Sequence, residues 1–459
     1  MINNKLRYLI AGCGVSGQAA ARLLSSLGFS YGIIDQKNNP ELRNFIRTLP
    51  HPPEQIILGW QESMSLPPVQ TVILSPGIRR ESAFFQALSH TADEMLSEPE
   101  FALQYVHCPT IAITGTNGKT TTTELTLFLL KACGISAESA GNIGVGLCDA
   151  AWNVLQNKTE LLVIEISSFQ LEYMNSFKPT AAAILNLASD HLDRHGSMKQ
   201  YAAIKFSLVQ DPETFPVFGR SLDFWRSRFV PAERQAYLFS SDPEDHRADF
   251  CLDSQGRILF QGQKIIDFNT LKLKGRHNAE NVMAALALIA AVKGKDFLMK
   301  PALQQALTEF QADAHRMELF LEEKGIRYIN DSKATNPHSV IAALNVFPEP
   351  GRIILLMGGL DKDMMFEEIL PHLKPVKQIF LYGACQDKIF RVLSEHVSCT
   401  LCSSFDDAVK KACSSACSGD IVMLSPATAS MDLFKNYRER GDRFKLLVQE
   451  FVRFPISAG

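Results

Sequence analysis

Short apolar runs alternate with amphipathic stretches along this chain, in a strand and helix order that repeats in three segments. In the first segment, Leu6 to Ile10 and Tyr31 to Asp35 each predict a strand, and Gln18 to Leu27 predicts the helix between them. Thr71 to Leu74 predicts a further strand. Strands that alternate with helices in this way are typical of an open α/β sheet, which we expect to extend to residue 107.

The second segment repeats the pattern with strands that are apolar throughout. Thr110 to Thr114 predicts a strand that runs into a glycine-rich loop, and a helix follows from Thr121 to Cys133. Leu161 to Ile166 and Ala181 to Leu187 are the kind of wholly apolar run that forms parallel strands covered on both faces. Two later elements are a short strand and a closing helix, Arg257 to Phe260 and Ala279 to Val292.

The third segment begins near Ala312 and again alternates strands with helices. Its predicted strands are Arg327 to Asn330, Arg352 to Met357, Gln378 to Tyr382 and Asp420 to Leu424. The chain is therefore predicted to be an α/β protein with three domains, at residues 1–107, 108–312 and 313–459. Ligand sites are expected in the clefts between such domains.

Composition narrows the class of protein. The 459 residues are 46% hydrophobic and 21% charged, with a net charge of −3 and a pI near 6.4. These values are typical of a globular protein, and they disfavour a nucleic-acid partner. No apolar run approaches the roughly 20 residues that a membrane span needs, and no signal peptide is recognisable, so we expect no membrane association and a cytoplasmic location.

The ten cysteines are expected to be free thiols in such a compartment. Four of them follow a C-x2-C and C-x3-C spacing that superficially resembles a zinc site. A structural role is the favoured interpretation. Cys399 and Cys402 face opposite sides of a predicted strand, and Cys413 and Cys417 lie on a helix that we expect to end at Gly419.

The strongest chemical signal is the glycine-rich sequence TGTNGKTTTT, Thr114 to Thr123. It lies between a predicted strand and a predicted helix, where backbone N–H groups and the helix dipole bind phosphate. Lys119 is expected to contact the β- and γ-phosphates of a nucleotide, and the Thr120 hydroxyl is expected to help hold Mg²⁺. The spacing is G-x2-G-K-T rather than the usual G-x4-G-K-[ST]. The alternative is a glycine turn that has a lysine by chance and does not bind phosphate.

Polar residues at the ends of two neighbouring predicted strands support this interpretation. Glu165 ends the apolar run LLVIEI, where a carboxylate is costly unless it is paired or bound to a metal. Asp190 and His191 follow the next strand, and the His191 imidazole could be a second metal ligand. The alternatives are a structural ion pair for Glu165 and a capping or surface role for His191.

A second glycine pattern lies at the N-terminus. Gly12, Gly14 and Gly17 form G-x-G-x-x-G between a strand and a helix, and Asp35 ends the next strand, which matches a dinucleotide-binding fingerprint. Because a separate nucleotide site follows downstream, a nucleotide-diphosphate substrate is favoured over a nicotinamide cofactor. Glycines that serve only a tight turn remain the structural alternative.

The C-terminal segment carries cationic and hydroxyl groups after several strands. Such groups at converging strand ends suit carboxylates and a γ-phosphate. The residues are Asp331, Ser332, Lys333, Thr335 and Asn336 in DSKATN, Lys362 in GGLDKD, and Ser425 and Ser430 in SPATAS. Any one of them alone could be an ordinary surface residue.

Together these residues resemble the Mur ligase family, which includes folylpolyglutamate synthetases, over essentially the whole chain. The matching motifs are TGTNGKTT, GNIG, EISSFQLE, DHLDRH, YAAIK, GRHNAEN, HRME, DSKATN and GGLDKD. Four features resemble the D-glutamate-adding branch: GCGVSG, SPGI, SSFQLE and the C-terminal SPATASMDLFKNYRERGDRF. The DNPR-type motif of the branch that adds diaminopimelate is not found.

The resemblance implies a Rossmann-like uridine-nucleotide domain, a central P-loop ATPase domain with a mostly parallel sheet, and a Rossmann-like C-terminal domain for the amino acid. It implies that ATP binds Gly115, Thr116, Asn117, Gly118, Lys119, Thr120, Thr121, Asn278, Asn281, Arg316 and Asp331. It places the UDP-sugar substrate at Gly14, Val15, Ser16, Asp35, Gln36, Lys37, Ser75, Gly77, Asn142, Ser167, Gln170 and His191. It places D-glutamate at Lys333, Thr335, Lys362, Ser430, Met431 and Tyr437.

The resemblance also implies catalytic roles for Lys119, Glu165, His191 and Lys205, with two Mg²⁺ ions held by Thr120, Glu165, His191 and a carbamate on Lys205. The expected reaction joins D-glutamate to UDP-N-acetylmuramoyl-L-alanine. ATP would first convert the substrate carboxylate to an acyl phosphate, which the amine then attacks. His191 is a candidate acceptor for the amine's proton, and we expect a monomer.

Three rival interpretations differ in the chemistry they require. A folylpolyglutamate synthetase would share the ATP site but would lack the GCGVSG domain. An oxidoreductase would bind nicotinamide at Gly12, Gly14 and Gly17. A non-catalytic nucleotide-binding protein is disfavoured because Lys119, Glu165, His191 and Lys333 are all present.

Overall fold

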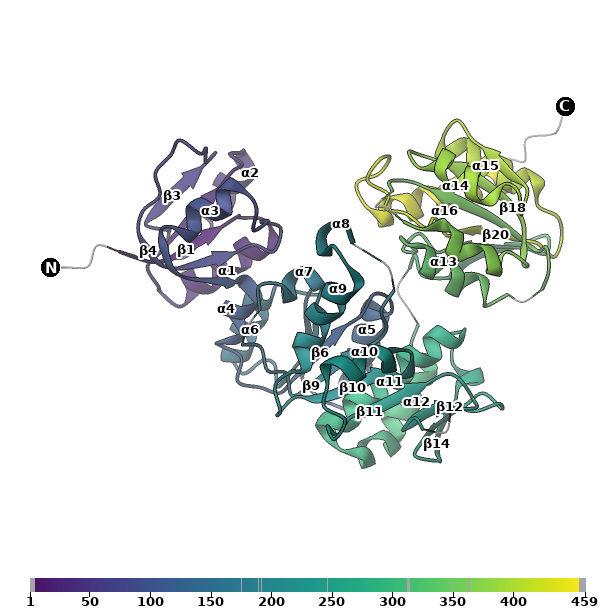
Figure 1. Ribbon diagram of the computed structural model, residues 1–459, viewed down its shortest axis with the longest axis horizontal. Coiled ribbons are helices and arrows are strands. Elements are labelled where there is room, and N and C mark those ends of the chain that lie inside the picture. Colours follow the sequence, from purple (N-terminus) through teal and green to yellow (C-terminus); the bar gives the residue numbers. More distant parts are fainter. Residues whose placement is uncertain are drawn as a thin grey trace. The chain divides into compact units, whose positions relative to one another are not determined.

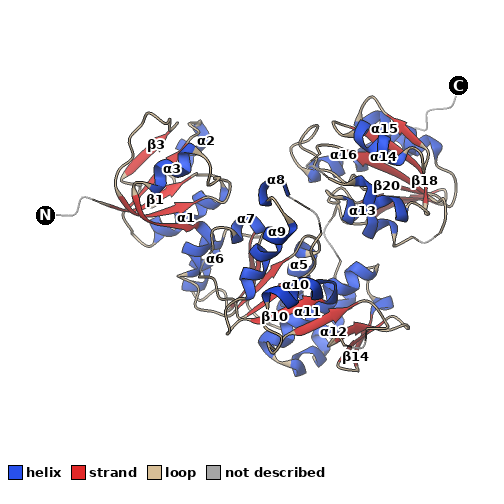
Figure 2. Cartoon of the chain, viewed as in Figure 1, coloured by secondary structure: helices blue, strands red, loops and turns tan. Residues whose placement is uncertain are grey.

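The structure is a computed structural model that describes residues 5–174, 176–188, 190, 192–245, 247–311, 314–347, 349–361 and 364–453. It is an α/β fold with three sheets (Figures 1 and 2). Contacts divide the chain into two compact units. The first unit is Met1–Asn186, Tyr201–Asp267 and Asn281–Thr308, and the second is Leu187–Gln200, Phe268–Glu280 and Glu309–Gly459.

The first sheet lies in the first unit and is parallel throughout, in the order β3-β2-β1-β4-β5. Its strands are β1 (Leu6–Ala11), β2 (Tyr31–Asp35), β3 (Gln55–Leu58), β4 (Val69–Leu74) and β5 (Ala92–Ser97). The helices are α1 (Val15–Ser26), α2 (Pro40–Arg47), α3 (Ala83–Ser89) and α4 (Glu98–Leu103). Because parallel strands end at the same edge, the G-x-G-x-x-G turn after β1 lies beside Asp35 at the end of β2.

The second sheet belongs to the same unit, in the order β14-β13-β12-β11-β10-β9-β6-β8-β7. The strands from β12 to β7 in this order are parallel to their neighbours. At the other end of the sheet, β13 pairs antiparallel with both β12 and β14. The strands are β6 (Thr110–Thr114), β7 (Ala137–Gly141), β8 (Leu161–Glu165), β9 (Ala181–Ile184), β10 (Phe215–Gly219), β11 (Tyr237–Ser240), β12 (Phe250–Leu252), β13 (Arg257–Phe260) and β14 (Gln263–Asp267).

The helices of this stretch of chain are mostly short. They are α5 (Lys119–Ala132), α6 (Leu147–Leu155), α7 (Ser168–Leu171), α8 (Leu192–His195), α9 (Met198–Phe206), α10 (Asp223–Phe229), α11 (Arg276–Lys293) and α12 (Pro301–Glu309). Short 3-10 turns lie at η1 (Ser207–Val209), η2 (Arg220–Leu222), η3 (Phe268–Thr270) and η4 (Lys295–Met299). Helix α6 packs against α1 and α4, which joins the second sheet to the first.

The third sheet lies in the second unit, in the order β15-β16-β20-β17-β18-β19. Only β15 is antiparallel to its neighbour. The strands are β15 (Glu318–Glu323), β16 (Ile326–Asn330), β17 (Ile353–Gly358), β18 (Val376–Tyr382), β19 (Cys399–Leu401) and β20 (Ile421–Leu424). The helices are α13 (Pro337–Leu344), η5 (Phe366–His372), α14 (Gln386–Leu393), α15 (Phe405–Ser415) and α16 (Tyr437–Arg453).

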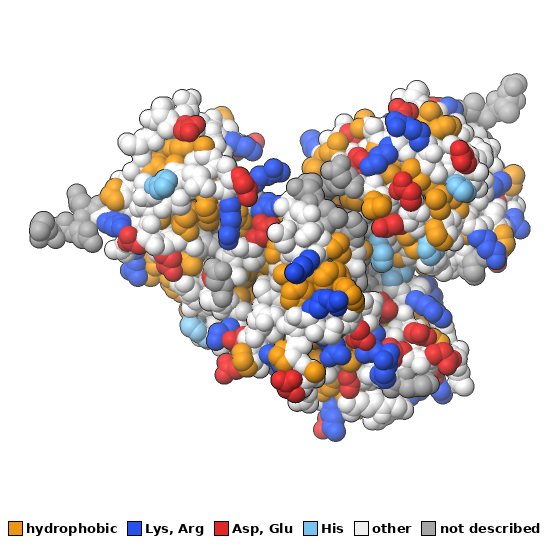
Figure 3. All heavy atoms as spheres, in the orientation of Figure 1, with side chains coloured by type: hydrophobic (Ala, Val, Ile, Leu, Met, Phe, Trp, Pro, Cys, Tyr) orange, Lys and Arg blue, Asp and Glu red, His pale blue; other side chains and the backbone are white. Residues whose placement is uncertain are grey.

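The alternation of apolar side chains along these strands builds two cores. Ile353, Leu355 and Met357 face α13, η5 and α14, while Ile354 and Leu356 face α15 and α16. A parallel strand covered on both faces must be apolar at every position, which explains the uninterrupted run IILLM. Among the described residues, no helix is long and apolar enough to cross a membrane. On the face shown in Figure 3, side chains of opposite charge are interspersed.

Several predicted element boundaries were wrong in an informative way. The predicted helix starts at Gln18 and Thr121 are too late, because α1 begins at Val15 and α5 at Lys119, directly inside the glycine loops. The predicted strand Ala181–Leu187 ends earlier, at Ile184, and leaves the following residues free to contact the P-loop. Cys417 was placed on a helix, but α15 ends at Ser415 and Cys417 lies beyond it.

Candidate active site

The P-loop, residues 115–118, joins β6 to α5 at the carboxyl edge of the second sheet. Gly115 and Gly118 have positive φ angles of 147° and 85°, which side-chain-bearing residues rarely adopt. The Lys119 ammonium donates to the carbonyl oxygens of Gly115 and Thr116 at 2.9 and 2.8 Å. Lys119 and Thr120 form the first turn of α5, the part of a helix where backbone N–H groups and the helix dipole favour a phosphate.

Asn186, which follows the neighbouring strand β9, holds this loop in place. Its carboxamide oxygen accepts from the Asn117 N–H at 2.8 Å, and its NH₂ donates to the Asn117 carbonyl at 3.0 Å. Its own carbonyl accepts from the Thr116 N–H at 3.0 Å. Asn186 was not among the residues predicted from the sequence. Its position in NLASDH, directly after a strand that neighbours the P-loop strand, was the available signal.

Asn281 on α11 and Lys205 on α9 approach the P-loop from other elements. The Asn281 side-chain oxygen accepts from the Thr122 hydroxyl at 3.3 Å, and it lies 2.3 Å from where a Cβ on Gly118 would be. The Lys205 ammonium, 1% exposed, donates to the Gly115 carbonyl at 3.1 Å and to the Thr114 hydroxyl at 3.3 Å. A buried lysine at the loop is unusual for an ordinary helix lysine.

Glu165 ends β8, the strand beside β6, and is paired in register with Ile113. Its side chain is 1% exposed, and its Oε1 accepts from the Asn142 carboxamide at 2.7 Å. Within the part of the chain that the structure describes, its Oε2 is buried without a hydrogen-bond partner. Leaving a carboxylate oxygen in this state is costly. A hard cation would satisfy it, so Glu165 fits a Mg²⁺ ligand.

Two of the expected functional side chains, His191 and Lys362, lie outside the described residues. Asn278 lies in the second unit, where its NH₂ donates to the Lys274 carbonyl at 2.9 Å. Ser167 and Gln170 form a reciprocal capping box at the start of α7, so both already hold a local structural role.

The N-terminal glycine loop is tightly packed against its own strand. A Cβ on Gly17 would lie 1.9 Å from the Gly12 carbonyl oxygen, so only glycine fits there. The two Asp35 carboxylate oxygens accept from the N–H groups of Cys13 at 2.5 Å and Lys37 at 2.7 Å. The Ser75 hydroxyl donates to the Gly12 carbonyl at 2.6 Å, which fixes the loop from the other side.

The other expected substrate contacts of this loop lie at the surface. Val15 is 81% exposed, an unusual state for a valine in the first turn of a helix. Gln36, Lys37 and Gly77 are exposed and Ser16 is half-buried. Side chains that remain open to solvent at a strand edge suit a ligand surface.

In the second unit, Asp331 follows β16 and is 7% exposed. Its carboxylate accepts from the Ser425 hydroxyl at 2.8 Å and from the Met317 N–H at 3.2 Å. Burial raises the pKa of Asp331 to about 7, and nearby Arg316 favours its charged form. The carboxylate thus joins the ends of β16 and β20.

Those of the expected D-glutamate residues that the structure describes occupy the same strand edge of this unit. Lys333 lies over the Tyr437 ring, with its ammonium 5.2 Å from the ring centroid. Ser430 is buried, whereas Met431 is 62% exposed, and Thr335 is half-buried. The loops after β16 and β20 therefore carry these side chains as neighbours, since the two strands are paired.

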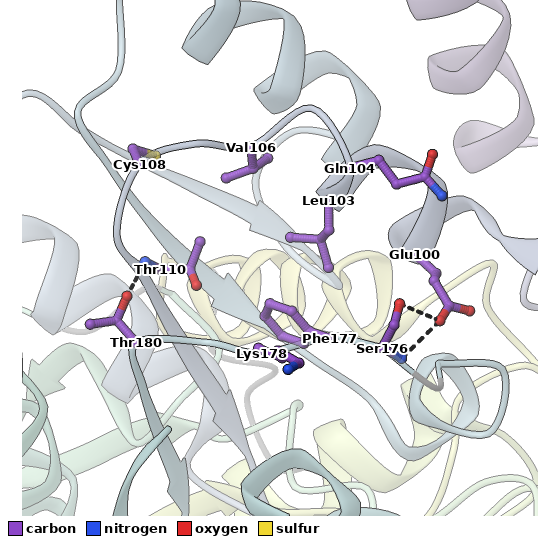
Figure 4. A pocket seen from close by; sticks show the side chains of 10 residues that line it. All are labelled: Glu100, Leu103, Gln104, Val106, Cys108, Thr110, Ser176, Phe177, Lys178 and Thr180. Atoms are coloured by element: carbon purple, nitrogen blue, oxygen red, sulfur yellow. Dashed lines mark hydrogen bonds between the residues drawn. The ribbon is translucent and has the colours of Figure 1, made fainter. Parts of the chain in front are cut away.

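A separate cavity of about 340 Å³ lies at the opposite edge of the second sheet (Figure 4). Leu103 and Phe177 project into it, and Thr110 and Thr180 line it at the start of β6 and just before β9. On its far side, Glu100 accepts from the Ser176 N–H and hydroxyl at 2.9 and 2.8 Å. The P-loop lies at the other end of β6, so this cavity is separate from the P-loop.

Comparison with known proteins identifies the family. The Mur ligase middle-domain profile matches residues 113–289, and the Mur ligase glutamate-ligase-domain profile matches residues 315–428. A UDP-N-acetylmuramoylalanine--D-glutamate ligase of Caldanaerobacter subterraneus subsp. tengcongensis is 35% identical over 97% of this chain and 99% of its own. One of Desulfitobacterium hafniense is 35% identical over 98% and 99%. The chain belongs to the Mur ligase family.

Solved structures agree on the fold. A UDP-N-acetylmuramate-alanine ligase from Thermotoga maritima superposes with a TM-score of 0.60 at 18% identity, covering 97% of this chain and 99% of that one. The Mur ligases are ATP-dependent enzymes that use Mg²⁺ and act in peptidoglycan precursor synthesis. The nucleotide class inferred from TGTNGKTT is therefore confirmed at the level of the family.

Proposed function

We propose that this Mur ligase joins D-glutamate to UDP-N-acetylmuramoyl-L-alanine, with ATP cleaved to ADP and phosphate. The observation that carries the proposal is the pairing of two features. The first is a P-loop with a buried carboxylate beside it, and the second is near full-length identity of 33–35% to relatives named UDP-N-acetylmuramoylalanine--D-glutamate ligase. The N-terminal G-x-G-x-x-G loop would bind the uridine diphosphate of the substrate.

The chain's own residues account for the first half of the reaction. A carboxylate cannot expel oxide, so the substrate carboxylate first attacks the γ-phosphate and forms an acyl phosphate. The Lys119 ammonium, held at the loop by two carbonyl oxygens, is placed to turn toward the β- and γ-phosphates when they displace those contacts. Asn186 and Asn281 keep the loop in shape around the phosphates.

Glu165 and Thr120, with His191 and a carbamate on Lys205, would hold two Mg²⁺ ions. Bound Mg²⁺ would neutralise charge that develops on the phosphoryl oxygens. The buried, unsatisfied Oε2 of Glu165 supports its place in this set. Burial of the Lys205 ammonium beside the P-loop supports the carbamate, because a carbamate converts a costly cation into a metal ligand where one is needed.

In the second half, the amine of D-glutamate attacks the acyl phosphate and phosphate leaves. Lys333, Thr335, Lys362, Ser430, Met431 and Tyr437 would bind D-glutamate, and Arg316, Asp331 and Asn278 would contact ATP. His191 would accept the amine's proton. The proposal includes a cytoplasmic monomer with domain boundaries near residues 107 and 312.

The decisive experiment measures phosphate release with ATP, Mg²⁺ and UDP-N-acetylmuramoyl-L-alanine against a panel of amino acids. D-Glutamate should give turnover, while L-glutamate, D-aspartate and meso-diaminopimelate should give only background. Turnover with another amino acid, or with folate substrates in place of the UDP-sugar, would refute the assignment. Carbon-13 bicarbonate tests the carbamate separately, because its NMR signal should be lost in Lys205→Arg.

A further inference from the structure

One arginine joins three strand ends of the third sheet. Arg440 lies in the first turn of α16 and is fully buried. Its Nε donates to the Ser332 hydroxyl at 3.0 Å, and its Nη2 donates to the Ser332 carbonyl at 2.8 Å. Nη1 and Nη2 both donate to the Thr428 carbonyl at 3.1 Å, and Nη1 reaches the Gly358 carbonyl at 3.5 Å. These acceptors follow β16, follow β20 and end β17.

Packing alone does not explain this residue. Burying a guanidinium whose direct partners are three carbonyl oxygens and a hydroxyl carries a large desolvation cost, and an apolar side chain of similar volume would avoid that cost. Burial accordingly lowers the pKa of Arg440, although Tyr382 and Asp432 nearby favour its charged form. The planar fork has a fixed geometry, so it sets the spacing of the carbonyl groups that it binds.

The three segments that Arg440 joins are those expected to bind the amino acid. Lys333 follows Ser332 directly, Thr335 lies three residues after Ser332, and Ser430 lies two residues after Thr428. The Ser332 hydroxyl also donates to the Tyr437 carbonyl at 2.8 Å, so the network includes the backbone of Tyr437, whose ring lies beneath the Lys333 ammonium. A shift of any one loop would therefore move an amino-acid-binding side chain relative to the others.

We propose that Arg440 is a positioning residue that fixes the relative placement of the loops after β16, β17 and β20, and thereby the pocket for the incoming dicarboxylic amino acid. This inference rests on the proposed function. Arg440 acts through Ser332, Gly358 and Thr428 and needs no contact with the substrate.

The test compares Arg440→Met and Arg440→Lys with Arg453→Met, a matched loss of charge at the exposed end of the same helix. In Arg440→Met, the KM for D-glutamate should rise by about 100-fold, while the KM for the UDP-sugar changes by less than about threefold. Arg440→Lys keeps the charge but loses the fork, so it should restore only part of the loss. Arg453→Met should match the wild type.

A merely structural role would give a different result. It would lower the melting temperature and kcat with an unchanged KM for D-glutamate, and that outcome would overturn the proposal. If Arg440→Met fails to fold, Ser332→Ala serves instead, because it removes the acceptor of Nε. It should raise the same KM by about 3- to 10-fold, and an unchanged KM would overturn the proposal.

Hydrogen exchange provides a readout that does not depend on the substrate. The amides of residues 331–336 and 425–430 should exchange faster in Arg440→Lys than in the wild type, and equal rates would contradict the positioning role. Failure of the proposed function would be seen differently, as wild-type protein that releases no phosphate with D-glutamate although its loops respond to the Arg440 variants.

Discussion

The first unit contains two glycine loops that use the same backbone arrangement for different tasks. Each follows a parallel strand, β1 or β6, and each leads directly into a helix, α1 or α5. In both, a side chain from the end of a neighbouring strand holds the loop by its backbone N–H groups. For the N-terminal loop this side chain is Asp35, and for the P-loop it is Asn186.

The two side chains that hold these loops, Asp35 and Asn186, differ in charge. The difference fits the group that each loop is proposed to bind. Asn186 is neutral and both accepts from and donates to Asn117, so it stabilises the P-loop without repelling a triphosphate. Asp35 is acidic and can only accept. An acidic side chain at the end of the second strand is suited to the hydroxyl and N–H groups of a nucleoside. Only the P-loop leads into a lysine, Lys119, which the proposed phosphoryl transfer requires.

The largest effect should come from removing that lysine. Lys119→Ala should lower kcat by at least about a thousandfold, because phosphoryl transfer depends on charge neutralisation at the γ-phosphate. The dissociation constant for the UDP-sugar, measured by calorimetry, should stay within about twofold, since the N-terminal loop is intact. Lys131→Ala, at the exposed end of the same helix, is the matched control. Equal losses of turnover and UDP-sugar binding would show that the loops do not act separately.

Disrupting the N-terminal glycine loop should instead affect stability and UDP-sugar binding. Gly17→Ala places a methyl group 1.9 Å from the Gly12 carbonyl oxygen, so it should destabilise the protein by about 3 kcal/mol in urea unfolding. It should also weaken UDP-sugar binding. Gly14→Ala meets no protein atom within 4 Å, so it should leave stability nearly unchanged and affect only the approach of the ligand. Similar unfolding free energies for the two variants would refute the packing role of Gly17.

Substitutions of Asn186 test whether its neutral side chain matters for ATP binding. Asn186→Asp should lower kcat/KM for ATP by about 100-fold, because the carboxylate repels the triphosphate and cannot donate to the Asn117 carbonyl. Asn186→Ala loses the hydrogen bonds without adding charge and should cost about tenfold. If alanine is as harmful as aspartate, the neutrality of Asn186 has no role in ATP binding.

These loops also show what the sequence could and could not predict. The strands and the glycine loops follow from local apolar runs and glycine spacing, so β2, β6 and β13 were predicted with the observed bounds. Asn186 and Arg440 were missed, because their partners Asn117 and Ser332 are far away in the sequence. No local pattern marks a side chain whose function is to join two loops. The starts of α1 and α5 were missed because glycine usually interrupts a helix.

A last and smaller effect tests whether the two loops belong to one cooperative unit. Glu98 begins α4 directly after the first sheet, is 2% exposed, and accepts from the Cys148 N–H at the start of α6 at 2.9 Å. Burial raises the pKa of Glu98 from 4.5 to about 7. At a pH between 4.5 and about 7, the Glu98 carboxyl group is mainly protonated in the folded protein and mainly ionised in the unfolded chain. The free energy of unfolding should therefore fall as the pH rises, by about 2 kcal/mol from pH 5 to pH 7.

Glu98→Gln removes this titration while keeping an acceptor for the Cys148 N–H. The difference in unfolding free energy between wild type and variant should therefore depend on pH in this window, measured by urea unfolding with two probes. One probe is UDP-sugar binding at the first loop, and the other is binding of an ATP analogue at the second. If both loops lie in one cooperative unit, both probes report the same midpoint and the same change with pH. Separate midpoints, with the pH effect confined to one, would show that the loops unfold independently.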